Sequence, residues 1–216
     1  MADPGLNQLL KWSIENSDAT RNDPSAQTDS NAAQQPHRGL NPELLQQLMG
    51  GPSDADLMRQ AMTVIHHPEA THEDKMTAWD NFEQMIENLD NANNMQNLGL
   101  WQPLVQKFDD SDSEVRTMAC WCVGTAVQNN IKCQEQVLAV GALPKIIDLA
   151  INDPDQGVRK KAIRALSSSV RNYQPGLDAA LSDIPQQFKP FKTTDAGDMT
   201  AVDQVIDKLR EHASKA

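Results

Sequence analysis

The chain has 216 residues and a formal net charge of −11, from 30 acidic and 19 basic residues. Phosphate backbones and anionic membrane surfaces would repel such a charge, so the composition argues against nucleic acid and membrane partners. Aromatic residues make up only 4%, and the abundance of Leu, Ala, Gln and Met favours helices over sheets.

Residues 1–17 predict a short amphipathic helix. Its apolar residues recur at helical spacing, at Leu6, Leu9, Leu10 and Ile14. A basic segment followed by an apolar run is missing here, so we expect no signal peptide. The whole sequence lacks the roughly 20 consecutive apolar residues of a membrane span. Residues 18–39 offer almost nothing that could pack in a core and predict a disordered linker.

Residues 40–183 predict a folded core of nearly continuous short helices. A helix is expected to begin at Asn41-Pro42 and to end at Gly50-Gly51. From Asp54 onward one short helix follows another, and Ser111 to Glu114 has the S-x-x-E form of a capping box.

A repeat organises this core. Three segments, Lys75–Asn88, Arg116–Asn129 and Arg159–Asn172, each begin with a basic residue and end with Asn, and their starts lie 41 and 43 residues apart. Each also has Ala three positions after its first residue and an aliphatic residue eleven positions after it. Between the long helices, Gly99-Leu100-Trp101 with Pro103 corresponds to Gly141-Ala142-Leu143 with Pro144.

A period near 40 residues is typical of armadillo and HEAT arrays, in which repeats stack because no repeat can bury its apolar face alone. We therefore predict an all-α, armadillo-like, right-handed solenoid of about three repeats with a flexible N-terminal arm. The third helix of each repeat should line a concave, protein-binding surface. Residues 184–216 fit the repeat poorly and predict a divergent cap helix, with apolar positions at Val202, Val205, Ile206 and Leu209.

No catalytic, cofactor or metal motif emerges. Phosphate-binding glycine loops and the G-x-S-x-G nucleophile elbow are missing. One metal-like group exists, but its spacing does not place two His at i and i+4 beside a carboxylate: His66, His67, His72, Glu69, Glu73 and Asp74. The three cysteines, at 120, 122 and 133, are odd in number and indicate packed thiols in a reducing compartment, so we expect a cytoplasmic protein. Because no catalytic motif emerges, we also expect that it is not an enzyme.

Polar amides gather where the first long helix ends, and Asn129 and Asn172 hold matching positions in later repeats. These amides could simply cap helix ends, or they could form a ladder that holds a partner's backbone. Ala92 is expected in the polar turn after the first long helix, where a small residue permits close approach. The candidate partner-binding residues are Asn81, Gln84, Asn88, Asn91, Ala92, Asn94, Thr125, Asn129, Ser168, Arg171 and Asn172.

The stretches WDNFEQMIENLDNANN, LGLWQPLV and CVGTAVQNN resemble the armadillo core of the fungal Fes-type nucleotide exchange factors, whose animal counterpart is the heat-shock-chaperone-binding protein. LNQLLKWSIENS and NPELLQQLMGG match the N-terminal pattern of that family. The resemblance covers roughly residues 6–17 and 40–175. It is weakest after Tyr173, where family members often carry a further clear repeat.

The resemblance implies a nucleotide exchange factor for the cytosolic heat-shock protein 70 (DnaK-type) chaperone. Its concave face would clamp the ATPase domain in an opened arrangement, without touching nucleotide, and so speed ADP release. It also implies that the N-terminal segment mimics a client and aids client release through Leu6, Leu9, Leu10, Trp12 and Ile14, unless that segment folds back on the core. We expect a monomer. The alternatives are an armadillo-type peptide-binding adaptor and, less well supported, an enzyme.

Overall fold

The computed structural model describes residues 51–190 and 194–215. The chain divides into two units, Met1–Ser53 and Asp54–Ala216, and all the described helices belong to the second. The segments predicted at residues 1–17, 18–39 and 41–51 lie outside the described residues, apart from Gly51. In the described part of the chain every regular element is helical, which confirms the predicted fold class.

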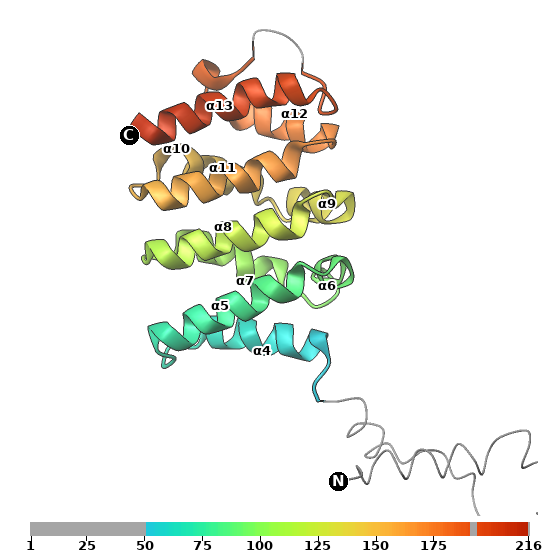
Figure 1. Ribbon diagram of the computed structural model, residues 1–216, viewed down its shortest axis with the longest axis vertical. Helices are drawn as coiled ribbons and strands as arrows, with labels where there is room; N and C mark the ends of the chain where they lie inside the picture. Colours follow the sequence, from blue (N-terminus) through green and yellow to red (C-terminus); the bar gives the residue numbers. More distant parts are fainter. Residues whose placement is uncertain (1–50, 191–193, 216) are drawn as a thin grey trace, which may run out of the picture. The chain divides into compact units, whose positions relative to one another are not determined.

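Short and long helices follow one another along the second unit (Figure 1). They are α4 (Asp54–His66), α5 (His72–Ile86), α6 (Leu89–Asn94), α7 (Trp101–Gln106), α8 (Ser113–Val127), α9 (Ile131–Ala139), α10 (Leu143–Asn152), α11 (Gln156–Val170), α12 (Gln174–Asp183) and α13 (Met199–Lys215), with 3-10 turns η2 (Lys107–Asp109) and η3 (Gln186–Phe188). The order α6–α7–α8 recurs as α9–α10–α11. Helices α5, α8 and α11 each have 15 residues, and they keep the predicted offsets at both ends.

Side-chain caps fix where the long helices begin. Thr71, Asp112 and Asp155 precede α5, α8 and α11 and accept hydrogen bonds from backbone N–H groups of the first turn. Such caps satisfy donors that have no partner inside the helix. The expected capping box at Ser111 is therefore wrong by one residue, because Asp112 is the N-cap and its Oδ1 accepts from Glu114 N at 2.9 Å. A carboxylate at the next position competes well with a hydroxyl for this role.

The matching glycines end equivalent helical turns. Gly99 and Gly141 have φ of 68° and 73°, a left-handed conformation that glycine adopts without strain. After each glycine the next N–H reaches back five positions in the same way, from Leu100 to Met95 and from Ala142 to Val137. The sequence match between these two turns therefore reflects one repeated geometry.

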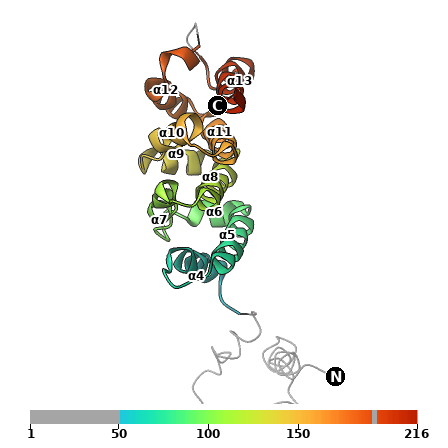
Figure 2. The same ribbon diagram turned by 90° about the vertical axis from the view of Figure 1, so that its left-hand side faces the viewer.

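A continuous core lies between the layers. Trp79, Phe82 and Ile86 of α5 are buried, as are Val123 of α8 and Ile163 of α11. Full burial of such a side chain contributes about 1.5–3 kcal/mol. Figures 1 and 2 show α5, α8, α11 and α13 side by side on one side of the stack, with α7, α10 and α12 on the other.

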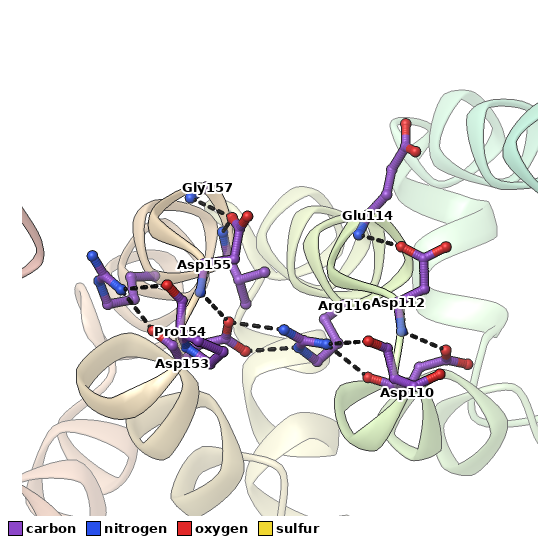
Figure 3. Close-up of polar contacts among 11 residues, drawn as sticks. Asp110, Asp112, Glu114, Arg116, Asp153, Pro154, Asp155 and Gly157 are labelled. Carbon is purple, nitrogen blue, oxygen red and sulfur yellow. Dashed lines mark hydrogen bonds and ion pairs between the residues drawn. The ribbon is translucent and has the colours of Figure 1, made fainter. Parts of the chain in front are cut away.

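Polar contacts of two arginines, called here the arginine rungs, join successive repeats at the N-terminal ends of the long helices (Figure 3). Arg116 of α8 forms two hydrogen bonds with the carboxylate of Asp153, at 2.7 and 2.9 Å, and donates to the carbonyl oxygens of Asp110 and Ser111. Arg159 of α11 donates in the same way to the carbonyl oxygens of Asp153 and Pro154. Arg116 and Arg159 therefore each bind the loop before their own helix, and Arg116 also binds the next repeat.

Helix α13 packs against α11 in the opposite direction. Arg171, just after the end of α11, contacts Met199 and Asp203 at the start of α13. Arg159 and Gln156, at the start of α11, donate to the carbonyl oxygen of Ala213 near the end of α13. By contrast, α5 and α8 run in parallel, since His72 at the start of α5 binds Glu114 at the start of α8. The carbonyl end of α13 thus takes the place at Arg159 that Asp153 takes at Arg116.

Candidate functional site

The outward surface of α5, α8, α11 and α13, called here the long-helix face, carries two adjoining grooves. The α5–α8 groove has a volume of about 450 Å³ and is lined by Glu83, Glu87, Trp121, Thr125, Gln128 and Asn129. The α8–α11 groove has a volume of about 310 Å³, and its lining includes Gly124, Lys161, Arg164, Ser168 and Arg210. Trp121, Thr125 and Gln128 line both, so α8 forms the ridge between the grooves.

Trp121 is the prominent apolar group on this ridge. Trp79 and Trp101 are buried in the core, whereas Trp121 is 41% exposed. Lys161 of α11 lies over its ring, with Nζ 3.1 Å from the ring centre. A cation over an aromatic face is attracted by the ring electrons. An exposed Trp held by a neighbouring side chain is a typical anchor of a protein interface.

Asp80, Trp121 and Arg164 occupy equivalent positions in the three long helices, given the offsets of 41 and 43 residues. All three are exposed. The face therefore presents an acid on α5, an aromatic ring on α8 and a base on α11. Within the described part of the chain, the side chains of Asp80 and Arg164 have no hydrogen bond or ion pair, although the protein as a whole is strongly acidic.

The groove walls extend this separation of charge. On the α5 side, Glu83 is 8% exposed and accepts a hydrogen bond from the Thr125 hydroxyl at 2.7 Å. On the α11 side, burial lowers the pKa of Lys161 and the nearby Arg164 lowers it further, while Glu83 opposes both. Helix α11 contains four basic residues and no acidic one. Lys161 and Arg164, which both line the α8–α11 groove, thus repel each other.

Three of the predicted residues lie in these grooves. Thr125 and Asn129 line the α5–α8 groove, and Ser168 lines the α8–α11 groove. Asn81 and Gln84 instead line a separate groove of about 850 Å³ between α4 and α5, beside Leu57 and other apolar residues. The structure therefore divides the expected set between different surfaces.

The asparagine ladder has a structural explanation. Asn88 caps α6, with its Oδ1 accepting from Asp90 N at 2.9 Å. Asn129 and Asn172 have φ of 53° and 57°, a left-handed conformation that Asn tolerates better than most residues. Two residues join α5 to α6, whereas three join the later pairs, so Asn88 matches the cap Asn130 rather than Asn129. The sequence match therefore does not place the three amides in one row.

The other predicted polar residues are engaged within the fold. The Nδ2 atom of Asn91 donates to Asp54 and to the carbonyl oxygen of Met85, at 2.8 and 3.0 Å. Asn94 accepts from Asn97. Arg171 donates to Ser167 Oγ at 2.9 Å and pairs with Asp203. The contacts of Asn91 and Arg171 tie helices together and that of Asn94 is local, so none of the three needs a partner protein to explain its place.

The expectation for Ala92 is wrong. This residue lies within α6 and is only 1% exposed, because α6 turns one side into the core. Arg at position 92 must displace packed neighbours, so we expect Ala92→Arg to destabilise the fold by about 1–3 kcal/mol. Thermal unfolding would measure this, with Asn97→Arg at an exposed position nearby as the control. An unchanged melting temperature would show that the site can open without cost.

Sequence reasoning missed Trp121, Lys161 and Arg164 as site residues. A signal was present, because Trp121 interrupts a polar stripe of α8 that runs through Glu114, Thr117, Thr125 and Gln128 at helical spacing. A large apolar residue in such a stripe faces solvent and is therefore a candidate contact for a partner protein.

His66 and His72 have structural partners, and the three cysteines are free and buried. His72 binds Asp112 and Glu114, and His66 contacts the carbonyl oxygen of Pro103. Among the described residues, no group of three or more His, Cys, Asp and Glu side chains could hold a metal ion. Burial raises the pKa of Cys133 to about 12 and raises those of the Cys120 and Cys122 thiols as well. These thiols are therefore protonated at neutral pH and poor nucleophiles.

Residues 51–190 and 194–215 include no helix with the length and apolar character needed to span a bilayer.

Comparisons with known proteins cover most of the chain. Residues 6–95 match the family described as nucleotide exchange factor Fes1, and residues 91–178 match the SIL1/FES1/HPBP1 C-terminal domain. The Hsp70 nucleotide exchange factor FES1 of Gibberella zeae is 51% identical, over 100% of both chains. The Neurospora crassa protein named Hsp70 nucleotide exchange factor fes-1 is 44% identical over 99% of this chain and 100% of its own length. The FES1 protein of Coccidioides immitis is 48% identical, over 97% and 98%.

Solved structures share the fold. An engineered protein aligns with a TM-score of 0.56 and 20% identity, over 82% of this chain and 69% of its own. A designed armadillo repeat protein in complex with the peptide (KR)4 aligns with a TM-score of 0.51 and 15% identity, over 73% and 69%. The predicted armadillo-like architecture is confirmed by these two neighbours.

Proposed function

Because the chain belongs to the Fes1 family of Hsp70 nucleotide exchange factors, we propose that it accelerates nucleotide release from an Hsp70 chaperone by binding the chaperone's ATPase domain with its long-helix face. The observation that carries this proposal is the 51% identity to an Hsp70 nucleotide exchange factor over the full length of both chains. The exposed Trp121 between two grooves supports the choice of face.

The proposed mechanism needs no contact with nucleotide. A rigid face that binds an opened arrangement of the ATPase domain better than the closed one shifts the population toward the opened state. A hundredfold faster release corresponds to a bias of about 2.7 kcal/mol. The rungs of Arg116 and Arg159 support such rigidity, because they fix the spacing of α8, α11 and α13.

Within this proposal the binding surface centres on Trp121, Thr125 and Gln128. Of the residues expected from the sequence, Asn129 and Ser168 adjoin this centre, and Asn81 and Gln84 would contact a partner that also reaches the α4–α5 groove. We propose that the protein acts as a monomer without catalytic chemistry of its own. The three cysteines are free and buried, which supports a reducing compartment such as the cytoplasm.

The test is the rate at which a fluorescent ADP analogue leaves a fungal Hsp70 ATPase domain when excess ADP is added. The wild-type protein is expected to raise this rate in a concentration-dependent, saturable way. A binding measurement run in parallel separates two failures: binding without acceleration would favour an adaptor, whereas absence of binding would overturn the proposal entirely.

We further propose that the N-terminal segment assists client release, because its apolar residues suit the extended, apolar peptides that Hsp70 holds. A tether of about two dozen residues would give it an effective concentration near the millimolar range once the core is bound. Replacing Leu9 and Leu10 with Ser is expected to slow release of a labelled client peptide and to leave nucleotide exchange unchanged. Survival of both rates, or loss of exchange alone, would contradict this role.

A further inference from the structure

The equivalent positions Asp80, Trp121 and Arg164 form an ordered row of acid, aromatic ring and base across the long-helix face. The two charged side chains have no partner within the described residues. The adjoining groove walls carry charges of the same signs in the same order: Glu83 and Glu87 lie on the α5 side, and Lys161 lies on the α11 side. The long-helix face therefore carries negative charge on one side of Trp121 and positive charge on the other.

We infer that this row sets the orientation of the chaperone on the face: the surface that crosses Trp121 carries carboxylates toward Arg164 and Lys161, and basic groups toward Asp80 and Glu87. The inference rests on the proposed function and adds the chemistry of the partner surface. Opposite charges arranged in this order favour one docking direction and repel the reversed one.

Arg164 is the clearest part of this arrangement. A charged neighbour on α11 is Lys161, which lies over the Trp121 ring and has a lowered pKa because of burial and of Arg164 itself. Arg210 also lines the groove, but it is already paired with Asp207. An incoming carboxylate would relieve the repulsion between Lys161 and Arg164, and the planar guanidinium of Arg164 can bind it through two hydrogen bonds.

The decisive comparison is between removal and reversal of the charge. Affinity of the full-length chain for the Hsp70 ATPase domain is measured for wild type, Arg164→Gln and Arg164→Glu. A partner carboxylate predicts a loss of roughly tenfold for Gln and of roughly a hundredfold for Glu, since Glu adds repulsion. The loss should shrink as salt is raised. Equal affinities for Gln and Glu would overturn the inference, as would tighter binding by Glu.

Lys160→Glu is the matched control. Lys160 lies on the same helix and is exposed, but its Nζ donates to Gln156 and it does not line either groove. The variant changes the net charge by the same amount as Arg164→Glu, and its affinity is expected to stay within about threefold of wild type. An equal loss in both variants would mean that only the overall charge matters, and the inference would fail.

Asp80 tests the other end of the row. Asp80→Lys is expected to weaken binding more than Asp80→Asn, and the reverse order would overturn the proposed orientation. These outcomes are distinct from failure of the proposed function, because that failure appears already when wild type neither binds the ATPase domain nor accelerates ADP release. All the variants are at exposed positions, so their melting temperatures should match wild type.

Discussion

Replacing Trp121 with Ala is expected to weaken binding of the Hsp70 ATPase domain by roughly 30-fold, or about 2 kcal/mol. The ring lines both grooves of the long-helix face, and 41% of it is exposed before any partner arrives. Covering a large rigid ring releases water at small entropic cost. The rate of ADP release at a fixed, subsaturating concentration should fall in proportion to the affinity.

Two controls separate this loss from damage to the fold. Trp121→Phe keeps an aromatic surface under Lys161 and should retain most of the affinity. Ile131→Ala removes an aliphatic side chain that is 55% exposed but lines neither groove, and it should leave the affinity unchanged. If Trp121→Ala binds within threefold of wild type, the ridge of α8 is not the centre of the interface.

Asp153→Ala is expected to have the largest effect on stability, about 3–5 kcal/mol. The Asp153 side chain is only 2% exposed, and it binds Arg116 through both oxygens and accepts from Asp155 N. Its removal leaves a nearly buried guanidinium without its carboxylate. At about 2–4 °C for each kcal/mol in a domain of this size, the melting temperature should fall by roughly 10 °C.

The exposed pair of Lys145 and Asp109 provides the comparison. These side chains are 43% and 67% exposed, so Lys145→Ala should cost less than about 1 kcal/mol. The double variant Arg116→Met, Asp153→Leu removes both charges and should recover part of the loss, because no unpaired charge remains. A melting temperature for Asp153→Ala close to that of Lys145→Ala would show that the rung contributes little.

The repeat was predictable because each long helix has the same beginning and the same buried positions. The offsets read from Lys75, Arg116 and Arg159 match the spacing of α5, α8 and α11, although each helix begins three residues before its basic residue and ends two residues before its Asn. The turns were harder to predict, because the turn between α5 and α6 is one residue shorter than the turn between α8 and α9. This difference moves Asn88 out of the row that its position in the sequence suggests. Ala92 was misplaced for a related reason: a six-residue helix gives too little periodicity to show which side is buried.

The row formed by Asp80, Trp121 and Arg164 could not be seen in the sequence alone, because it depends on the register of three helices at once. Asp80 and Arg164 look like ordinary surface charges until the offsets bring them beside Trp121. The direction of α13 was equally hidden, because an amphipathic pattern shows which side of a helix is apolar but not which way the helix runs.

The reversed α13 limits how this protein can change in length. The repeat from α9 to α11 supplies Arg159, which binds the loop before its own helix, and Asp153, which binds Arg116 of the repeat before it, so duplication of this segment would renew the same contacts. At α13 the contact differs, because Arg159 donates instead to the carbonyl oxygen of Ala213, near the end of a helix that runs in the opposite direction. A duplicated repeat would therefore keep these contacts if it were inserted before α11, whereas one inserted between α11 and α13 would have to meet α13 in the same antiparallel way.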